Sequence, residues 1–137
     1  MMTKGRVNDM KPLIAVPIGD PAGIGPEIVV KSIANKDVFQ AARCIIIGDK
    51  KEMEDAIAFT KIPLKINVIK KPGQGVFEEN IINLIDLDNV DMNELKLGEV
   101  SGMCGKAAYE YIAKSIELAN SGEVDAVSTL PCLRFEE

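Results

Sequence analysis

The residues best suited to chemistry lie in one short turn, Ile18–Ile28, with the sequence IGDPAGIGPEI. The turn follows the apolar run Leu13–Val16 and leads into a helical pattern, so glycines and prolines are concentrated between a predicted strand and a predicted helix. Glycine allows positive φ and close backbone approach, and proline is favoured in a first helical turn. The first-turn N–H groups, beside Asp20 and Glu27, can therefore hold a polar ligand. From spacing alone, a turn that only packs strand against helix explains the pattern equally well.

Two nucleotide-binding motifs do not match this turn. A dinucleotide fingerprint requires G-x-G-x-x-G, whereas the glycines here follow G-x-x-x-G-x-G. A phosphate loop requires G-x-x-x-x-G-K-[ST], and Lys31-Ser32 lies too far along the chain to complete it. The spacing therefore leaves the class of ligand open.

As a whole, the string Ile18–Ile28 resembles the N-terminal signature of the 4-hydroxythreonine-4-phosphate dehydrogenase family, with its phospho-threonate and phospho-erythronate dehydrogenase relatives. The G-D-G-I-G-P-E string of isocitrate and isopropylmalate dehydrogenases is similar, but the inserted Pro21-Ala22 favours the phosphothreonine group. Residues 101–112, SGMCGKAAYEYI, resemble the family's S-x-x-x-G-K-A-A-Y-x-Y-I helix, and residues 122–129, GEVDAVST, resemble the strand after it. The resemblance extends from about Leu13 to Pro131. It implies an isopropylmalate dehydrogenase-like fold.

The resemblance also implies an activity. Members are NAD-dependent dehydrogenases that oxidise, with decarboxylation, 4-phosphohydroxy-L-threonine or a related phosphorylated hydroxy acid, as in pyridoxal phosphate biosynthesis. They are homodimers, and a divalent metal polarises the alkoxide and the developing ketone. The family's metal-binding histidines lie in motifs such as G-H-T-E and Y-H-D-Q-G, and this chain has no histidine. We therefore expect the metal ligands, and most of the NAD site, outside this sequence, and we expect the chain alone to be inactive.

The resemblance ends near the C-terminus. In the family, the last matching strand continues into a T-x-P-[IV]-[NH]-K turn, whereas here Thr129-Leu130-Pro131 is followed by CLRFEE. We interpret residues 1–131 as the N-terminal part of a dehydrogenase-like α/β domain. Residues 132–137 are interpreted as a divergent tail from a truncated or frame-shifted longer gene. The alternative is a non-catalytic α/β module that binds a small anion at the Gly19–Glu27 loop.

Three residues are candidates for a substrate cleft. Gly19 and Asp20 open the turn after the first predicted strand, and Thr129 ends the last one. In open parallel sheets, ligands bind at the edge formed by the carboxyl ends of the strands. A structural role explains each candidate equally well, because glycine, aspartate and threonine are also turn and cap residues. The acidic segment 86–91 suggests calcium, but it lacks the glycine and final glutamate of an EF-hand, so a solvated surface turn is favoured.

Composition restricts the class of protein. The chain has 137 residues, of which 47% are hydrophobic and 27% charged, as expected for one globular domain. The net charge of −5 and the absence of a basic cluster argue against nucleic-acid binding. Cys44, Cys104 and Cys132 include no C-x-x-C pair, which indicates free thiols in a reducing compartment. No apolar stretch approaches the ~20 residues of a membrane span. We expect a cytoplasmic protein with a small phosphorylated substrate.

Alternating strand and helix patterns predict a mostly parallel sheet with helices on both faces. The predicted strands are Leu13–Ile18, Cys44–Ile47, Leu64–Ile69, Leu84–Leu87 and Asp125–Thr129. The predicted helices are Pro26–Asn35, Lys50–Phe59 and Gly102–Asn120. For the longest helix, the spacing predicts a buried stripe of Ala108, Ile112, Ser115, Ile116 and Ala119. Ser101 is its predicted N-cap, and at most one of Tyr109 and Tyr111 can lie in the core.

Overall fold

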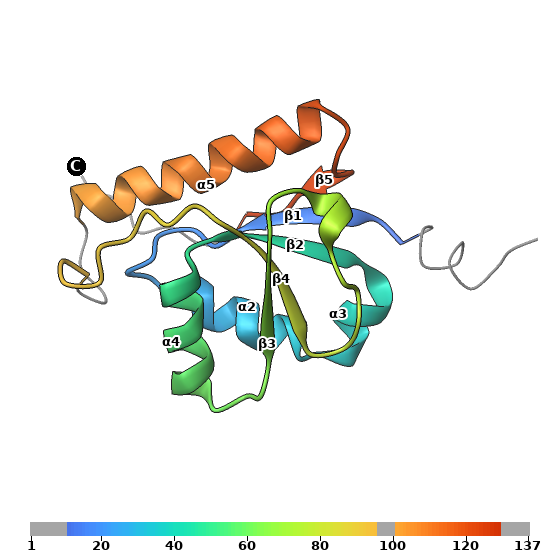
Figure 1. Cartoon of the computed structure of the whole chain (residues 1–137), viewed down its shortest axis with the longest axis horizontal. Helices are drawn as coiled ribbons and strands as arrows, with labels where there is room; N and C mark the ends of the chain where they lie inside the picture. The colour runs from blue at the N-terminus through green and yellow to red at the C-terminus, as the bar shows by residue number, and fades with distance from the viewer. Residues whose placement is uncertain (1–10, 96–100, 130–137) are drawn as a thin grey trace, which may run out of the picture.

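A computed structural model describes residues 11–95 and 101–129 of the chain. Its strands form one parallel sheet in the order β3-β4-β2-β1-β5 (Figure 1). The strands are β1 (Leu13–Pro17), β2 (Arg43–Gly48), β3 (Lys65–Ile69), β4 (Ile81–Asp86) and β5 (Ala126–Val127). The helices are α2 (Gly25–Ile33), α3 (Lys36–Ala41), α4 (Lys50–Thr60) and α5 (Gly102–Asn120), with a 3-10 turn η1 (Pro72–Gln74). The predicted α/β class and parallel sheet are confirmed.

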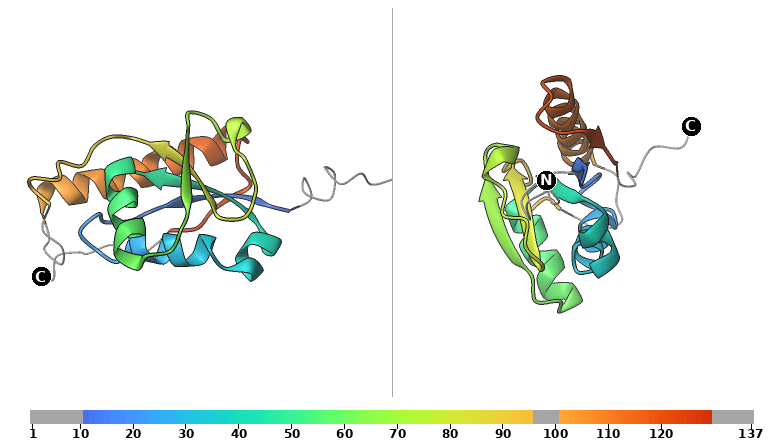
Figure 2. Two further views of the ribbon diagram at one scale, coloured as in Figure 1. Left: turned by 60° about the horizontal axis from the view of Figure 1, so that its bottom comes forward. Right: turned by 90° about the vertical axis from the view of Figure 1, so that its right-hand side faces the viewer.

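Helices cover the two faces of the sheet unequally. Helices α2, α3 and α4 lie on one face, whereas α5 lies on the other, across β1, β2 and β5 (Figures 1 and 2). The prediction of helices on both faces is therefore confirmed. No helix within the described ranges is both long and apolar enough to cross a membrane.

The core lies where the central strands pass between these helical layers. Its fully buried members come mainly from β1, β2 and β4 and from the helices above and below: Ala15, Val30, Ile45, Ile46, Ile47, Met53, Ile82, Leu84, Ala107 and Tyr111. Strands covered on both faces are expected to be apolar throughout rather than alternating. The run Ile45–Ile47 in β2 follows this rule, because all three side chains are buried.

One helix was not predicted. The expected helix Pro26–Asn35 ends at Ile33, and a second helix, α3, begins at Lys36. Asn35 separates them as the N-cap of α3, because its Oδ1 accepts hydrogen bonds from the N–H groups of Asp37, at 2.8 Å, and Val38, at 3.3 Å. Asparagine is among the preferred N-cap residues. The same residue therefore marks the start of a helix rather than the end of one.

Two strands differ from the predicted bounds by more than one residue at one end, and the other three differ by one residue at one or both ends. Strand β4 covers Ile81–Asp86 instead of Leu84–Leu87, because it pairs in register with all of β3. Strand β5 is only Ala126–Val127, shorter than the predicted Asp125–Thr129. Asp125 lies just before β5 and links it to β1, because its carboxylate accepts a hydrogen bond from the Leu13 N–H at 2.8 Å. The tail predicted for residues 132–137 lies outside the described residues.

Helix α5 has the predicted limits and the predicted cap. The Ser101 Oγ accepts a hydrogen bond from the Cys104 N–H at 3.1 Å. The predicted buried stripe is partly wrong, because Ile116 is 48% exposed and Ile112 is half-buried. The residues that face the sheet are Cys104, Ala107, Ala108, Tyr111, Ser115 and Leu118. Tyr111 is buried and Tyr109 is 71% exposed, which confirms that only one of the two tyrosines lies in the core.

Candidate functional site

The candidate site lies at the edge formed by the carboxyl ends of the parallel strands. The chain leaves β1 at Pro17, and the next residue, Ile18, is still held to the sheet because its N–H donates to the Ile47 carbonyl at 3.0 Å. Gly19 then turns the chain with a φ of 78°, in the left-handed region that favours glycine. Thr129 follows β5, which pairs in parallel with β1, and it is exposed. The structure therefore brings Gly19, Asp20 and Thr129 to one edge, as predicted from the strand pattern.

Two glycines near this edge are required for packing around Ile18. A Cβ at Gly25, where α2 begins, would overlap the carbonyl oxygen of Ile18. A Cβ at Gly48, the last residue of β2, would lie 2.9 Å from the Ile18 Cδ1. Both positions are thus filled by the protein itself. Neither glycine opens space for a dinucleotide, so the cofactor implied by the sequence resemblance does not fit at these two positions.

Asp20 fixes the shape of the loop by accepting hydrogen bonds from the N–H groups of two residues that follow it. Its carboxylate Oδ1 accepts a hydrogen bond from the Ala22 N–H at 2.8 Å, and its carbonyl oxygen accepts one from Gly23 at 2.8 Å. This side-chain contact two residues along the chain is an Asx turn. The Asp20 side chain is buried. Burial also raises the pKa of the neighbouring Cys104 thiol, and the Asp20 carboxylate adds to that shift.

Two replacements of Asp20 separate the hydrogen bond that forms the turn from the charge of the carboxylate. Alanine leaves the buried Ala22 N–H without a partner, so we expect Asp20→Ala to lower the free energy of unfolding by about 1–3 kcal/mol. Asparagine keeps the Oδ1 acceptor, so Asp20→Asn should cost less than half as much. Urea unfolding followed by circular dichroism measures both. Equal losses for the two variants would show that the carboxylate charge, rather than the turn, stabilises this loop.

The first turn of α2 has no side-chain cap, and its acidic residue interacts with its own helix. Its N-cap residue, Ile24, makes no capping hydrogen bond through its side chain. The Glu27 carboxylate pairs with Lys31, one turn further along the helix, at 3.3 Å. Glu27 therefore interacts along the exposed surface of its own helix.

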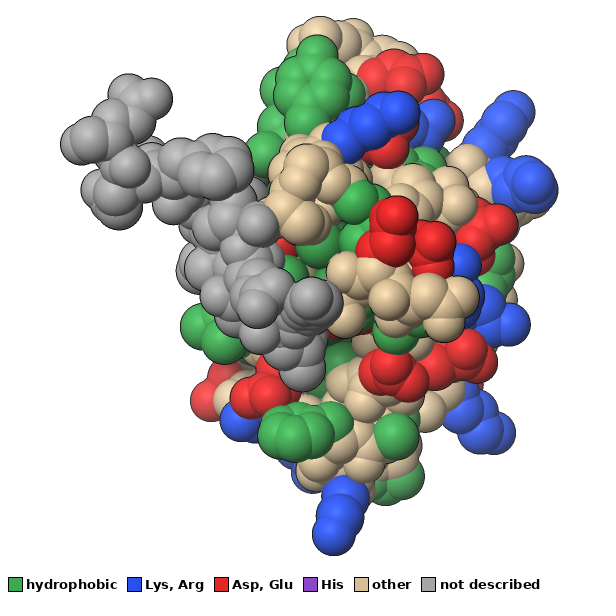
Figure 3. Space-filling model, turned by 90° about the vertical axis from the view of Figure 1, so that its left-hand side faces the viewer, with side chains coloured by type: hydrophobic (Ala, Val, Ile, Leu, Met, Phe, Trp, Pro, Cys, Tyr) green, Lys and Arg blue, Asp and Glu red, His purple; other side chains and the backbone are tan. Residues whose placement is uncertain are grey.

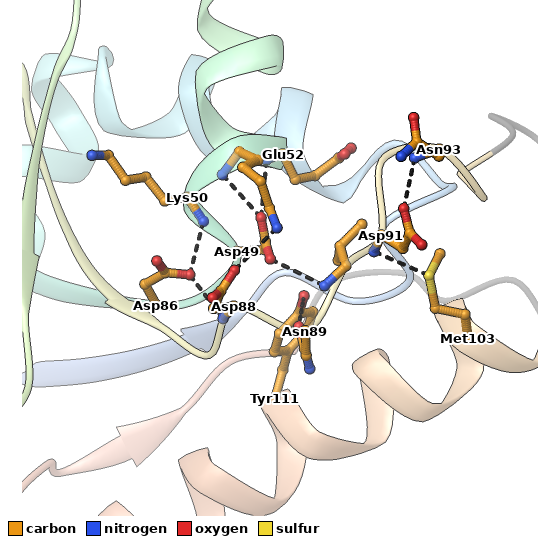
Figure 4. A network of polar contacts seen from close by, with 12 residues as sticks. Asp49, Lys50, Glu52, Asp86, Asp88, Asn89, Asp91, Asn93, Met103 and Tyr111 are labelled. Carbon is orange, nitrogen blue, oxygen red and sulfur yellow. Dashed lines mark hydrogen bonds and ion pairs between the residues drawn. The ribbon is translucent and has the colours of Figure 1, made fainter.

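A second group of polar residues, which no sequence pattern marked as a group, lies beside this loop (Figure 4). At its centre is Asp49, a buried residue that follows β2 and caps α4. Its Oδ1 accepts from the N–H groups of Lys51, at 2.9 Å, and Glu52, at 3.3 Å, and its Oδ2 accepts from Val90 at 3.1 Å. Asp49 thereby ties α4 to the segment that follows β4. The Gly48-Asp49 pair after an apolar run was the available signal, and it indicates a helix cap.

Glu52 has the most unusual environment in this group. Its side chain is 5% exposed, and its Oε2 has no hydrogen-bond partner. Figure 4 shows it extending from the first turn of α4 away from the Asp49 carboxylate. Burial raises the pKa of Glu52 to about 7, and the negative charges of Asp55 and Asp49 add to the shift. No sequence pattern distinguishes this glutamate from its exposed neighbour Glu54.

Tyr111 and Asn89 join the segment after β4 to α5. The Tyr111 hydroxyl donates to the Asn89 Oδ1 at 2.7 Å, and the Asn89 Nδ2 donates to the Glu110 Oε1 at 2.8 Å. Burial raises the pKa of Tyr111 above its ordinary value, and the charge of Asp49 adds to this effect. The tyrosine is therefore a neutral hydrogen-bond donor that holds the loop against the helix.

The acidic segment 86–91 is organised by backbone contacts and one ion pair. The Asp86 Oδ1 accepts from the N–H groups of Lys50, at 3.0 Å, and Asp88, at 2.9 Å, and the Asp91 Oδ1 accepts from Asn93 at 2.9 Å. Asp88 pairs with Lys51 at 3.0 Å. These contacts are those of a surface turn. In the part of the chain that the structure describes, no three His, Cys, Asp or Glu side chains are placed to hold a metal ion. The described residues therefore do not fit the metal implied by the sequence resemblance.

The surface of this edge carries charges of both signs. Figure 3 shows acidic and basic side chains interspersed with apolar and uncharged polar ones, without a large patch of one sign. A site for a phosphorylated anion would need locally arranged N–H groups or cations, since the surface as a whole does not attract anions. The described residues thus form this edge of the sheet and hold its loops in place.

Comparison with known proteins identifies the family. Residues 40–134 match the family model described as "Pyridoxal phosphate biosynthetic protein PdxA". The chain belongs to the PdxA family. Among its relatives, the "Putative D-threonate 4-phosphate dehydrogenase" of Clostridium botulinum strain Hall is 53% identical over 121 residues, which cover 88% of this chain and 36% of the relative. The protein of the same name from Fusobacterium nucleatum is 52% identical, over 89% of this chain and 37% of the relative.

Solved structures of PdxA-type enzymes share the fold. The 4-hydroxythreonine-4-phosphate dehydrogenase from Burkholderia phymatum matches with a TM-score of 0.86 and 38% identity, over 90% of this chain and 37% of that one. The enzyme of the same name from Klebsiella pneumoniae matches with a TM-score of 0.83 and 34% identity, over 90% and 38%. This PdxA-family chain therefore spans little more than a third of the length of the relatives it matches. The resemblance noted in the sequence is confirmed.

Proposed function

We propose that this chain is the N-terminal part of a dehydrogenase dependent on NAD and a divalent metal. Its substrate, oxidised with decarboxylation, would be 4-phosphohydroxy-L-threonine, as in pyridoxal phosphate biosynthesis, or a related phosphorylated hydroxy acid such as D-threonate 4-phosphate. The family match over residues 40–134 carries the proposal. The names and shared fold of the relatives support the substrate class. We further propose that the protein is cytoplasmic and forms a homodimer.

In this proposal, the described residues position the substrate rather than transform it. The Asx turn at Asp20 holds the Ile18–Ile24 loop in one conformation, and exposed Thr129 presents a hydroxyl at the same edge. A preorganised edge of this kind lowers the entropy lost when a substrate is oriented for reaction. The metal and NAD would be held by residues that this chain lacks. We therefore expect no dehydrogenase turnover from the chain alone.

A chimera tests the proposal. In the Clostridium botulinum relative, the segment aligned with this chain is replaced by the sequence of this chain, which is 53% identical there. We expect NAD- and metal-dependent turnover of D-threonate 4-phosphate or 4-phosphohydroxy-L-threonine by the chimera, and none by the chain alone, both measured from NADH absorbance. Turnover by the purified chain alone, or a folded chimera without turnover on either substrate, would contradict the proposal.

The role of Thr129 is tested in the same chimera. Removing a hydroxyl that orients substrate should lower kcat/KM at least about tenfold in Thr129→Ala. Ser128→Ala is the matched control, because Ser128 is also an exposed hydroxyl residue and neighbouring side chains of an extended segment point to opposite sides. Equal effects of the two substitutions would remove Thr129 from the site.

A further inference from the structure

A small pocket lies at the amino edge of the sheet, opposite the candidate site. Arg43 and Cys44 begin β2 and Ile81 begins β4, and all three residues line the pocket. Phe39 of α3 and Phe77 of the loop before β4 contribute further walls. The pocket contains about 390 Å³ of empty space, part of which is its open mouth. This edge lies on the right-hand side of Figure 1, where β1 and β2 begin.

The walls of this amino-edge pocket are mostly apolar, and the protein covers them only in part. Ile33, Val38, Phe39 and Phe77 line the pocket and are each half-buried. Two of the four are phenyl rings that come from different elements, α3 and the loop before β4. Aromatic rings attract one another in offset-stacked and edge-to-face arrangements. The walls therefore favour a flat apolar group.

Two cations lie beside these phenyl rings. The Lys11 Nζ is 4.7 Å from the centre of the Phe39 ring, and the Arg43 guanidinium carbon is 5.6 Å from that of Phe77. Both cations are half-buried, whereas Glu78, the acidic residue among the described lining residues, is exposed. Charges interact more strongly where they are partly shielded from water. The two cations therefore outweigh Glu78, and the pocket is complementary to an anionic group.

The wall that carries Phe77 is held in place before any ligand binds. The buried Asn83 accepts a hydrogen bond from the Val76 N–H through its Oδ1 and donates one to the Val76 carbonyl through its Nδ2, both at 2.9 Å. A Cβ at Gly75 would lie 2.6 Å from the Phe77 Cζ, so glycine allows the ring to pack against the backbone. A wall that is already ordered loses little entropy when a ligand binds.

The two cations are also held in place. The Lys11 Nζ donates to the Phe39 carbonyl at 3.0 Å. The Arg43 Nε and Nη2 donate to the Lys11 carbonyl at 3.2 and 3.1 Å. An ammonium group has three donors, and the Phe39 carbonyl takes one of them, so Lys11 can also donate to a ligand.

We propose that the amino-edge pocket binds a small aromatic carboxylate. Its ring packs against Phe39 and Phe77, and its carboxylate faces Lys11 and Arg43. Strand β2, which separates this edge from the candidate site, has six residues and is therefore about 20 Å long. The ligand is thus a different molecule from the substrate proposed above, and its binding does not depend on whether the chain belongs to an active dehydrogenase.

A titration of the isotope-labelled whole chain with sodium benzoate, followed by two-dimensional amide NMR spectroscopy, tests the proposal. We expect saturable shifts of the amide signals of Val38, Phe39 and Cys44, with a Kd in the millimolar range because the ligand is so small. Benzylammonium has the ring with the opposite charge, and acetate has the charge without the ring. Each should bind at least about fivefold more weakly than benzoate.

Three variants test the electrostatic part of the site. Lys11→Met removes the charge and keeps the apolar stem, so it should raise the benzoate Kd at least about fivefold. Lys36→Met is the matched control, because Lys36 is exposed at the start of α3 and is not among the residues that line the pocket. Glu78→Gln removes the opposing charge and should lower the Kd about twofold. A purely structural disturbance would weaken binding rather than strengthen it.

Circular dichroism shows whether each variant is folded, and the comparison of the three ligands tests the proposal on the unaltered chain. Absence of saturable shifts, equal affinity for benzoate and either control ligand, or equal effects of Lys11→Met and Lys36→Met would overturn the proposal. Shifts of the same amides on dilution of the protein alone would show that a second copy fills the pocket, which would also overturn it.

Discussion

Replacing Asp49 with alanine is expected to lower the free energy of unfolding by about 2–4 kcal/mol. The change removes the N-cap of α4, which accepts from Lys51 and Glu52. It also leaves the buried Val90 N–H, 3.1 Å from the Asp49 Oδ2, without a partner. Urea unfolding followed by circular dichroism gives the change in the unfolding free energy. A loss below about 1 kcal/mol would show that the segment after β4 is held by other contacts.

Asp49→Asn separates the contribution of the α4 N-cap from that of the hydrogen bond to Val90. Asparagine is as good an N-cap as aspartate, so its Oδ1 keeps the contacts to the first turn of α4. Its Nδ2 cannot accept from the Val90 N–H, which leaves one donor unpaired at a cost of about 1–3 kcal/mol. The asparagine variant should therefore lie between the wild type and Asp49→Ala. If it equals the wild type, the contact to Val90 contributes nothing.

The sequence predicted the strands and helices whose ends are marked by local signals. Helix α5 has its predicted limits because Ser101 caps one end and Gly122 follows the other. Strand β2 was recognised from its continuous apolar run, which is typical of a strand covered on both faces. Helix α3 was missed because it follows α2 so closely that Asn35, its N-cap, was read as the end of α2.

The buried face of α5 was harder to predict because the helix has two apolar stripes. Spacing alone cannot tell which stripe faces the sheet. In the structure, the stripe that contains Tyr111 faces the sheet, because the Tyr111 ring is buried and its hydroxyl donates to Asn89. That contact joins residues 22 positions apart, and no local pattern predicts it. Ile116 was therefore assigned to the core, although it is on the surface.

The sheet edge at which the candidate residues lie was predictable, but the contacts that support them were not. Parallel strands bring their carboxyl ends together, so Gly19, Asp20 and Thr129 were expected at one edge. The buried Asp49 and Glu52 were not predicted, because their burial depends on how α4 packs against α2 and the sheet. A sequence shows charged residues at these positions. It does not show that the fold buries them away from solvent.

Stability of the chain is expected to fall as pH rises from about 4.5 to about 7, because of Glu52. Burial raises the pKa of Glu52 to about 7 in the folded protein, from an ordinary value of 4.5. The folded state therefore holds a proton that the unfolded state has released between these two values. The stabilisation is fully present below about pH 4.5 and is lost as pH rises through about 7. Its full size is up to about 3 kcal/mol.

Glu52→Gln should remove this dependence on pH. The amide has nearly the same shape and stays neutral, so the variant should exceed the wild type in unfolding free energy by about 1–3 kcal/mol at about pH 8 and match it near pH 4. Glu54→Gln is the control, because Glu54 lies on the same helix and is exposed. Urea unfolding across this pH range measures all three proteins. If the wild type and Glu52→Gln show parallel profiles, then Glu52 is charged in the folded state at neutral pH, and its unpartnered oxygen must gain a partner there.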